Sequence, residues 1–260
     1  NGDDPYSETL RQACRCRVLS YGLRTPADLH GAVIGEDPSG IVLSLARAGD
    51  ETARATVPVH GPYGASNALA ALGAALSLGV PWATCIERLS SLPPVAGRWN
   101  LFRRTDGADA IVDFAHTPDG LFQILSVVRR LYARVVIVFG CAGGSDRGKR
   151  SQMGEIASRF ADVVVLTQDN PKYEEPEAIL DEIEAGIPAA HPAIRIVDRR
   201  QAIEDAVHRV GRGDVLLLAG KGHETFQIVR GEFLPHSDAA ILTSLGFVPV
   251  SPEKAEGARR

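Results

Sequence analysis

Glycines and cations are concentrated in the segment GCAGGSDRGKR at residues 140–150. Arg147, Lys149 and Arg150 supply positive charge, and the glycines let a ligand approach the backbone closely. Backbone N–H groups in such a loop, together with cationic side chains, bind carboxylate or phosphate oxygens. The composition of the segment therefore predicts an anion site, with a solvated basic turn as the simpler alternative.

The same segment differs by one residue from a phosphate-binding P-loop. Gly143 and Gly148-Lys149 have the spacing Gly-x-x-x-x-Gly-Lys, but the position for a magnesium-binding Ser or Thr hydroxyl is occupied by Arg150. An arginine cannot coordinate a cation, and Ser151 is displaced by one position. The pattern therefore disfavours a nucleotide hydrolase built on this loop, which stays the weakest alternative for the function of the chain.

Polar motifs follow four of the strand-like runs of the chain. Besides the glycine-rich segment, they are DFAHTPD at residues 113–119, DNPK at 169–172 and GKGHE at 220–224. Each has a simple explanation when taken alone, because Thr117-Pro118 suits a helix start and Gly-rich residues suit a turn. Ligands of open parallel sheets bind outside the carboxyl ends of the strands. We therefore expect the four motifs to meet along one edge of a sheet and to form a binding site.

The elements that would position these motifs alternate regularly in the second part of the chain. Apolar strands are predicted at residues 110–114, 135–139, 163–167, 194–197 and 215–219. Three helices have apolar residues at i, i+3, i+4 and i+7, namely Leu121, Ile124, Leu125, Val128; Met153, Ile156, Ala157, Phe160; and Ile203, Ala206, Val207, Val210. The alternation predicts a Rossmann-like, doubly wound α/β fold with a mostly parallel sheet covered on both faces.

The first part of the chain differs from the second. Strand-like runs separated by Gly, Pro and Asp are predicted at residues 17–21, 31–35, 40–46 and 53–59. An Ala/Leu-rich helix near residues 67–78 follows, and paired prolines within residues 92–97 would form a hinge. We therefore expect one domain at residues 1–96, a second at 97–250 and a flexible tail at 251–260.

Composition and charge exclude several classes of protein. The chain of 260 residues is 45% hydrophobic and 23% charged, and it contains no apolar run long enough to cross a bilayer. Its formal net charge of −4 gives no general basic field for nucleic acid. Four cysteines are too few for a secreted disulfide scaffold, and Cys14 and Cys16 lack a second ligand pair at zinc-binding spacing. We expect a cytoplasmic protein with reduced thiols, no metal site within this chain, and no membrane or nucleic-acid partner.

Taken in order along the chain, the motifs resemble those of the Mur ligases. The matching segments are GPYGASN at residues 61–67, GRWN at 97–100, DFAHTPD, the glycine-rich segment, DNPK, and AGKGHE at 219–224. They extend over nearly the whole chain and are most similar to the MurE type, the UDP-N-acetylmuramoyl-tripeptide synthetases. The resemblance is to the carboxyl-terminal part of such an enzyme only.

The resemblance implies an ATP-dependent amide ligase of peptidoglycan biosynthesis. Such enzymes convert the D-Glu carboxylate of UDP-N-acetylmuramoyl-L-Ala-D-Glu to an acyl phosphate, which the amine of an amino acid, often meso-diaminopimelate, then attacks. The chemistry requires an electrophilic carboxylate and a set of cations and amides that brings two anions together. Residues 1–96 would be the remainder of the central, ATP-binding domain, and residues 97–250 the carboxyl-terminal, amino-acid-binding domain.

The resemblance also implies roles for individual residues. ATP would be bound by Asn67 and His116 beside the adenine, by Asp113 at the ribose and by Arg98 near the phosphates. The incoming amino acid would be bound by a second set, which comprises Ser145, Lys149, Asp169, Asn170, Lys172, Gly220 and Glu224. Carboxylates in this set suit the amines of the substrate, and a cation suits its carboxylate.

Four departures from the motifs of the family stand out. Trp99-Asn100 replaces Met-Glu, and Gly64 replaces an asparagine. Gly144-Ser145 stand where the family has Asp-Arg, so an arginine that would bind a substrate carboxylate is replaced. Lys172 replaces another arginine and keeps its charge without the bidentate geometry. Because a charged hydrogen bond contributes about 1.5–3 kcal/mol, a different acceptor amino acid is an alternative to meso-diaminopimelate.

The P-loop, the carbamylated lysine and the magnesium ligands of the family belong to a segment before Asn1. ATP and Mg²⁺ are therefore the expected cofactors, with the magnesium ligands upstream, and no catalytic set is complete within these residues. The expected partners are a UDP-sugar peptide, an amino acid, and a missing N-terminal half or a companion subunit. Two alternatives remain, a non-catalytic truncated binding module and a ligase for a different acceptor in secondary metabolism.

Overall fold

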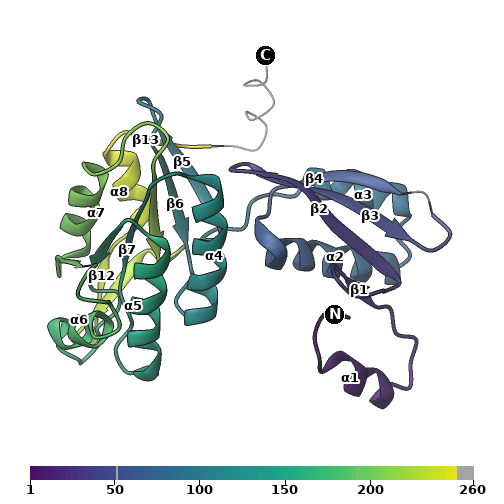
Figure 1. Ribbon diagram of the computed structural model, residues 1–260, viewed down its shortest axis with the longest axis horizontal. Coiled ribbons are helices and arrows are strands. Elements are labelled where there is room, and N and C mark those ends of the chain that lie inside the picture. Colours follow the sequence, from purple (N-terminus) through teal and green to yellow (C-terminus); the bar gives the residue numbers. More distant parts are fainter. Residues whose placement is uncertain (51, 192, 251–260) are drawn as a thin grey trace. The chain divides into compact units, whose positions relative to one another are not determined.

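The computed structural model describes residues 1–50, 52–191 and 193–250 of the chain (Figure 1). The chain divides into two compact units, Asn1–Pro94 and Val95–Arg260. The division falls inside the proline-containing segment at residues 92–97, whereas the expected tail at 251–260 lies outside the described residues. Among the described helices, none has both the length and the apolar character needed to cross a membrane.

The N-terminal unit is built on a four-stranded sheet with the order β1-β2-β3-β4. Its strands are β1 Tyr21–Gly22, β2 Leu29–Asp37, β3 Gly40–Arg47 and β4 Ala53–Val57. Its helices are α1 Ser7–Ala13, α2 Gly61–Ser77 and α3 Trp82–Ser90. Leu43 and Leu45 of β3 pack with Leu69 and Leu72 of α2 in one apolar core, whereas α1 contributes no buried residue. Burial of the α2 face therefore anchors this helix on the sheet.

The predicted strand at residues 17–21 is wrong. Residues 17–20 form no strand, and the short strand β1 that pairs with β2 begins only at Tyr21. The carboxylate of Asp28 accepts hydrogen bonds from the backbone N–H and the hydroxyl of Ser20, both at 2.7 Å. The backbone N–H of Ser20 therefore donates to the Asp28 side chain, and not to a neighbouring strand.

The C-terminal unit contains a seven-stranded sheet with the order β13-β5-β6-β10-β7-β8-β9 (Figure 1). Its strands are β5 Asn100–Arg104, β6 Asp109–Asp113, β7 Val135–Phe139, β8 Val163–Leu166, β9 Ile194–Arg195, β10 Val215–Ala219 and β13 Phe247–Pro249. The five strands from β6 to β9 in this order are parallel, and β5 and β13 are antiparallel to their neighbours. The prediction of a mostly parallel sheet is confirmed.

Helices cover both faces of this sheet, and the side chains of β7 show why its sequence is continuously apolar. Val135, Ile137 and Phe139 belong to one core with α4 Pro118–Leu131, α5 Gly148–Phe160 and α6 Pro176–Glu184. Val136 and Val138 belong to a second core with α7 Arg199–Val207 and α8 Asp238–Ser244. Successive side chains of a strand point to opposite faces of the sheet. Because both faces are covered, every residue of β7 must be apolar.

A small hairpin completes the C-terminal unit. Strands β11 Phe226–Val229 and β12 Glu232–Pro235 are antiparallel and are joined by Arg230 and Gly231, both with positive φ. Two positive φ angles in a two-residue connection match the right-handed twist of paired strands. Lys172 forms an isolated bridge with Val229, so the hairpin is attached to the loop that follows β8.

Candidate functional site

The four polar motifs contact one another in a closed series at the carboxyl ends of β6, β10, β7 and β8. Lys149 Nζ donates to the carbonyl of His116 at 2.8 Å, and Gly143 N donates to the carbonyl of Asn170 at 2.9 Å. Asn170 Nδ2 donates to Glu224 Oε2 at 3.0 Å, and Gly220 N donates to the carbonyl of Asp113 at 3.1 Å. The motifs therefore meet at one edge of the sheet, as expected.

Glycines permit this contact because the loops touch through their backbones. A Cβ on Gly140 would lie 1.9 Å from the carbonyl oxygen of Thr167, and one on Gly143 would lie 2.0 Å from that of Pro171. Gly220 has φ +104°, and a Cβ there would lie 2.7 Å from the carboxylate of Asp169. These three glycines bring the loops after β7, β8 and β10 together, so access for a ligand is not their only function.

Lys221 lies at the centre of the contact between two of these loops and has 0% side-chain exposure. Its ammonium donates to Asn170 Oδ1 at 2.9 Å, Glu224 Oε2 at 2.5 Å and the carbonyl of Phe226 at 2.6 Å. The three N–H donors of the lysine are therefore all used. The sequence analysis did not select Lys221; the signal for it was a cation between two glycines directly after a fully apolar strand.

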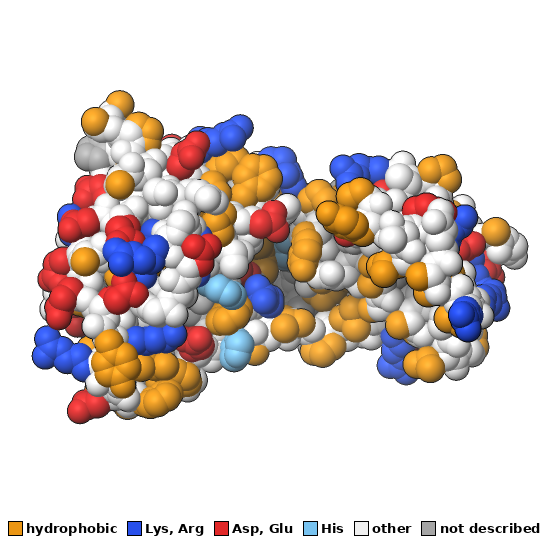
Figure 2. Space-filling model, turned by 90° about the horizontal axis from the view of Figure 1, so that it is seen from below, with side chains coloured by type: hydrophobic (Ala, Val, Ile, Leu, Met, Phe, Trp, Pro, Cys, Tyr) orange, Lys and Arg blue, Asp and Glu red, His pale blue; other side chains and the backbone are white. Residues whose placement is uncertain are grey.

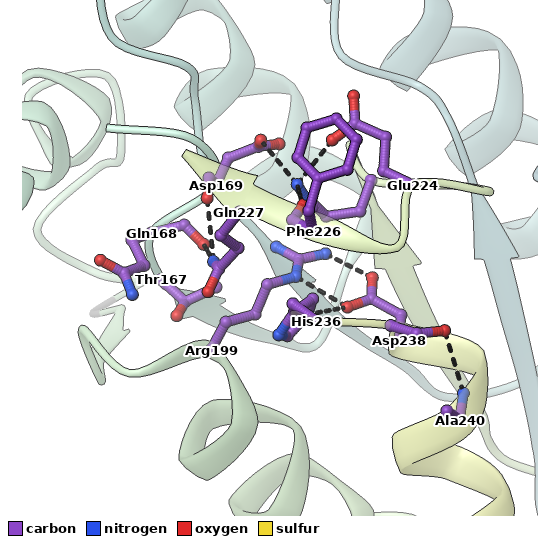
Figure 3. Close-up of polar contacts among 12 residues, drawn as sticks. Thr167, Gln168, Asp169, Arg199, Glu224, Phe226, Gln227, His236, Asp238 and Ala240 are labelled. Atoms are coloured by element: carbon purple, nitrogen blue, oxygen red, sulfur yellow. Dashed lines mark hydrogen bonds and ion pairs between the residues drawn. The ribbon is translucent and has the colours of Figure 1, made fainter. Parts of the chain in front are cut away.

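Asp169 is a buried carboxylate, 5% exposed, whose Oδ1 lies 3.9 Å from the ammonium of Lys221 (Figure 3). Burial raises the pKa of Asp169, and the positive charges of Arg199 and Lys221 oppose that rise. Because both cations lie in the protein interior, the carboxylate is enclosed between fixed positive charges.

Arg199 is held by a second acidic residue, as Figure 3 shows. Its guanidinium group donates to the two carboxylate oxygens of Asp238 at 2.9 and 2.7 Å and to the carbonyl of Ala219 at 3.0 Å. His236 Nε2 lies 2.8 Å from Asp238 Oδ1. Burial alone would raise the pKa of Asp238, but the Arg199 charge and hydrogen bonds outweigh burial and lower it. This cluster, which the sequence analysis also missed, fixes the last residue of β10 just before Gly220.

The anion site predicted from the cations of residues 140–150 is wrong for Arg150, whose guanidinium group is enclosed, and stays a prediction for Arg147 and Lys149. Arg150 is 0% exposed and pairs with Glu174 at 2.9 Å and Glu182 at 2.8 Å, and Arg147 also pairs with Glu182. The hydrogen bonds from Arg150 lower the pKa of Glu174 to about 2. Glu174 and Glu182 therefore pair with these guanidinium groups, whereas the ammonium of Lys149 donates to the carbonyl of His116 in the DFAHTPD motif.

Ser145 and Lys172 are both held by hydrogen bonds to backbone groups. The hydroxyl of Ser145 donates to the carbonyl of Ala142 at 2.7 Å, so it is directed into its own loop. Lys172 has φ +55°, and its backbone is held by hydrogen bonds to the hairpin at Ile228 and Arg230. A Cβ on Gly144 would lie 3.9 Å from Lys172 Nζ, and within the described part of the chain this ammonium has no acidic partner.

A cavity of about 270 Å³ lies beside Lys172 and is lined by residues 171–176 together with Val229 and Arg230. Figure 2 shows basic and acidic side chains interspersed over the visible face of the C-terminal unit. The described residues include no group of three or more His, Cys, Asp or Glu side chains arranged to hold a metal ion.

The residues expected near a nucleotide fall in two units. Asp113 is buried, which raises its pKa, and its carboxylate accepts hydrogen bonds from the N–H groups of Trp99 and Ala115, each at 2.8 Å. Arg98 lies over the ring of Phe114 at 5.2 Å, and the ring of His116 lies 4.6 Å from the same ring. Asn67 is an exposed residue of α2 in the N-terminal unit.

Two family models match the chain. The Mur ligase middle domain matches residues 1–75, and the Mur ligase glutamate ligase domain matches residues 97–222. The UDP-N-acetylmuramoyl-L-alanyl-D-glutamate--2,6-diaminopimelate ligase of Alkalilimnicola ehrlichii is 44% identical over 95% of this chain and 50% of its own length. The protein with the same name from Geobacillus thermodenitrificans is 38% identical over 93% of this chain and 50% of its own length. The chain thus spans about half the length of the curated relatives it matches.

Of two similar solved structures, one supports the same assignment and the other shares the fold. One described as a UDP-N-acetylmuramoyl-L-alanyl-D-glutamate--2,6-diaminopimelate ligase is 31% identical, with a TM-score of 0.65 over 93% of this chain and 51% of its own. A UDP-N-acetylmuramoylalanyl-D-glutamyl-2,6-diaminopimelate--D-alanyl-D-alanyl ligase from Acinetobacter baumannii is 16% identical with a TM-score of 0.68 over 93% of this chain and 49% of its own, and so shares the fold. The resemblance to MurE-type ligases is confirmed. The chain belongs to the Mur ligase family and matches its middle domain and its glutamate ligase domain.

Proposed function

We propose that this chain is the acceptor-binding part of a MurE-type ligase. The complete enzyme would join a diamino acid such as 2,6-diaminopimelate to the D-Glu carboxylate of UDP-N-acetylmuramoyl-L-Ala-D-Glu. The proposal rests on the hydrogen bonds that join Asn170, Lys221 and Glu224. They lie at the edge of the sheet where ligands of this fold class bind. Identity of 44% to a protein named as a 2,6-diaminopimelate ligase supports the same class of acceptor.

The charges of the site suit a zwitterion that carries a second amine. Glu224 is partly exposed and offers carboxylate oxygen to an ammonium group, with the buried charge of Asp169 behind it. Lys172 offers a cation to the carboxylate of the same amino acid. Gly220, Ser145 and Lys149 would border this acceptor site. These groups would hold the acceptor so that its amine lies close to the activated carboxylate. Such positioning makes a bimolecular reaction effectively unimolecular.

The nucleotide side of the proposal involves Asn67, Arg98, Asp113 and His116. Phe114, with Arg98 and His116 against its ring, provides aromatic and cationic groups that suit a base and its phosphates. ATP, when bound, would supply the phosphoryl group that activates the D-Glu carboxylate. The described residues include no cluster of ligands for Mg²⁺, so no step at that ion is assigned to them. The cytoplasmic location and the companion half stay predictions.

A different acceptor amino acid is the alternative that a specific observation favours. Gly144 provides no side chain beside Lys172, and the Ser145 hydroxyl is bonded to its own loop. One lysine, rather than two arginines, would then bind the acceptor carboxylate, which weakens selection for a second carboxylate on the substrate.

Calorimetry of the 260-residue chain with meso-2,6-diaminopimelate, L-lysine and L-alanine tests the proposal. We expect binding of a diamino acid and none of L-alanine, and loss of that binding in Glu224→Gln. At one hundred times its dissociation constant, the bound amino acid should raise the free energy of unfolding by about 2.7 kcal/mol. Glu204→Gln, a partly exposed carboxylate of α7 that pairs with Arg200, is the matched control. Binding of L-lysine in preference to diaminopimelate would favour the alternative acceptor, and binding of none of the three would contradict the acceptor site.

A further inference from the structure

Lys221 contacts the proposed acceptor site from inside the protein. Its side chain has no exposure, and its three donors are used by Asn170, Glu224 and the carbonyl of Phe226. The ring of Phe226 also lies 5.7 Å from the ammonium. A fully enclosed and fully bonded ammonium has no donor left for a substrate, so any effect on ligand binding must pass through the residues that it holds.

The first of these residues is Asn170, whose amide orientation follows from its two donors. Oδ1 accepts from Lys221 Nζ at 2.9 Å and from the backbone N–H of Ile228 at 3.0 Å. Both contacts require an acceptor atom, so the oxygen must occupy that position and Nδ2 must face the other way. Nδ2 then donates to Glu224 Oε2 at 3.0 Å. Lys221, together with the backbone N–H of Ile228, therefore determines which end of the Asn170 amide faces Glu224.

The second residue is Glu224, whose two carboxylate oxygens differ. Oε2 accepts from both Lys221 and Asn170, whereas Oε1 accepts no hydrogen bond from the residues that the structure describes. The side chain is 23% exposed, so one oxygen is held and the other has access to a ligand. Burial alone would raise the pKa of Glu224, but the hydrogen bonds from Lys221 and Asn170 outweigh burial and lower it.

We propose that Lys221 is a positioning residue of the acceptor site, which fixes the Asn170 amide and holds Glu224 as a carboxylate with one oxygen directed to the substrate amine. This inference rests on the proposed function for its ligand, but not for its geometry. Other titratable groups near Glu224 in the described part of the chain are His223 on the same loop, Asp169 after β8 and Arg199 of α7. None of these donates a hydrogen bond to Glu224 within the described residues, so Lys221 is the direct cationic partner.

The test combines a titration with a binding measurement on the 260-residue chain. NMR of ¹³C-labelled glutamate carboxyls should give a pKa for Glu224 below its ordinary value in the unaltered chain, and a higher pKa in Lys221→Met. Calorimetry with meso-2,6-diaminopimelate should show that Lys221→Met loses affinity about ten- to a hundredfold.

Two further variants separate positioning from a general loss of stability. Lys221→Arg keeps the charge and should keep the pKa of Glu224 low. Arg150→Met removes an equally buried cation whose partners are Glu174 and Glu182, so it should lower stability and leave the Glu224 titration unchanged. A Glu224 pKa at or above its ordinary value in the unaltered chain, or unchanged affinity in Lys221→Met, would overturn the inference. If no amino acid binds the unaltered chain, the proposed function fails while the titration still tests Lys221.

Discussion

Arg150 has a structural role at the position where a P-loop would carry a hydroxyl. Its guanidinium group is enclosed, its Nη1 and Nη2 donate to Glu174, Glu182 and the carbonyl of Ala142, and its Nε has no hydrogen-bond partner among the described residues. Removing one partner of such an ion pair leaves the other charge uncompensated, which lowers the free energy of unfolding. The residue therefore links the start of α5 to the loop and helix that follow β8.

Arg150→Thr tests this role against the nucleotide-hydrolase alternative. The substitution restores the pattern Gly-x-x-x-x-Gly-Lys-Thr, yet we expect no gain in ATP affinity, because the loop is packed on Pro171 and Asn170. The free energy of unfolding should fall by about 2–3 kcal/mol, less than for a fully enclosed pair because both glutamates are partly exposed. Chemical denaturation and ATP calorimetry measure the two effects, with exposed Arg159→Thr on the same helix as control. Unchanged stability together with new ATP binding would reinstate the P-loop.

Residue types at the site were predictable, whereas their partners were not. Asp169, Asn170 and Glu224 stood out because polar residues ended apolar strands. Lys221 and Arg199 did not, because a buried cation is recognised only when its distant acids are known. Asn170 is 51 residues from Lys221, and Asp238 is 39 residues from Arg199. Contacts between residues so far apart are set by the order of strands in the sheet.

At the scale of elements, the five parallel strands and the helices between them followed from their apolar patterns. The short antiparallel elements β5, β11, β12 and β13 were missed, because they have three to five residues and no continuous apolar run. Sequence spacing also gave no reason for the closeness of α5 and α6. That closeness depends on two glycines that the sequence analysis did not single out.

Gly154 and Gly186 allow α5 to lie against the end of α6. A Cβ on Gly154 would lie 2.1 Å from the carbonyl oxygen of Ile183, and one on Gly186 would lie 1.8 Å from that of Ser151. Gly154→Ala should therefore separate the two helices and lower the free energy of unfolding by about 1–3 kcal/mol, despite the higher helix propensity of alanine. Urea denaturation of the purified variant measures this change.

Gly211→Ala is the matched control for that substitution. A Cβ on Gly211 meets no atom within 4 Å, and the residue does not have a positive φ. We expect a change within about 0.5 kcal/mol of zero, or a slight gain from reduced flexibility of the unfolded chain. If the free energy of unfolding falls equally in the two variants, then Gly154 is not required for the close contact between α5 and α6.

At the scale of the whole molecule, the two units have separate apolar cores. The core of the N-terminal unit joins β2, β3 and β4 to α2 and α3, and the two cores of the C-terminal unit lie on opposite faces of its sheet. All seven residues proposed for the acceptor lie in the C-terminal unit, whereas Asn67 of the nucleotide set lies in the N-terminal unit. Under the proposed assignment, the division of the chain would separate binding of the acceptor from part of nucleotide binding.

This separation predicts that residues 95–260 fold alone and keep the acceptor site. The fragment retains the seven-stranded sheet, both of its cores, and the hydrogen bonds among Asn170, Lys221 and Glu224. We expect a cooperative unfolding transition, and an affinity for meso-2,6-diaminopimelate within about twofold of the 260-residue chain, because no acceptor residue is removed. Calorimetry of the two proteins in parallel makes the comparison, with Glu224→Gln in the fragment as the negative control. If the fragment folds but no longer binds meso-2,6-diaminopimelate, residues 1–94 must contribute to the acceptor site. The set of seven proposed acceptor residues would then be incomplete.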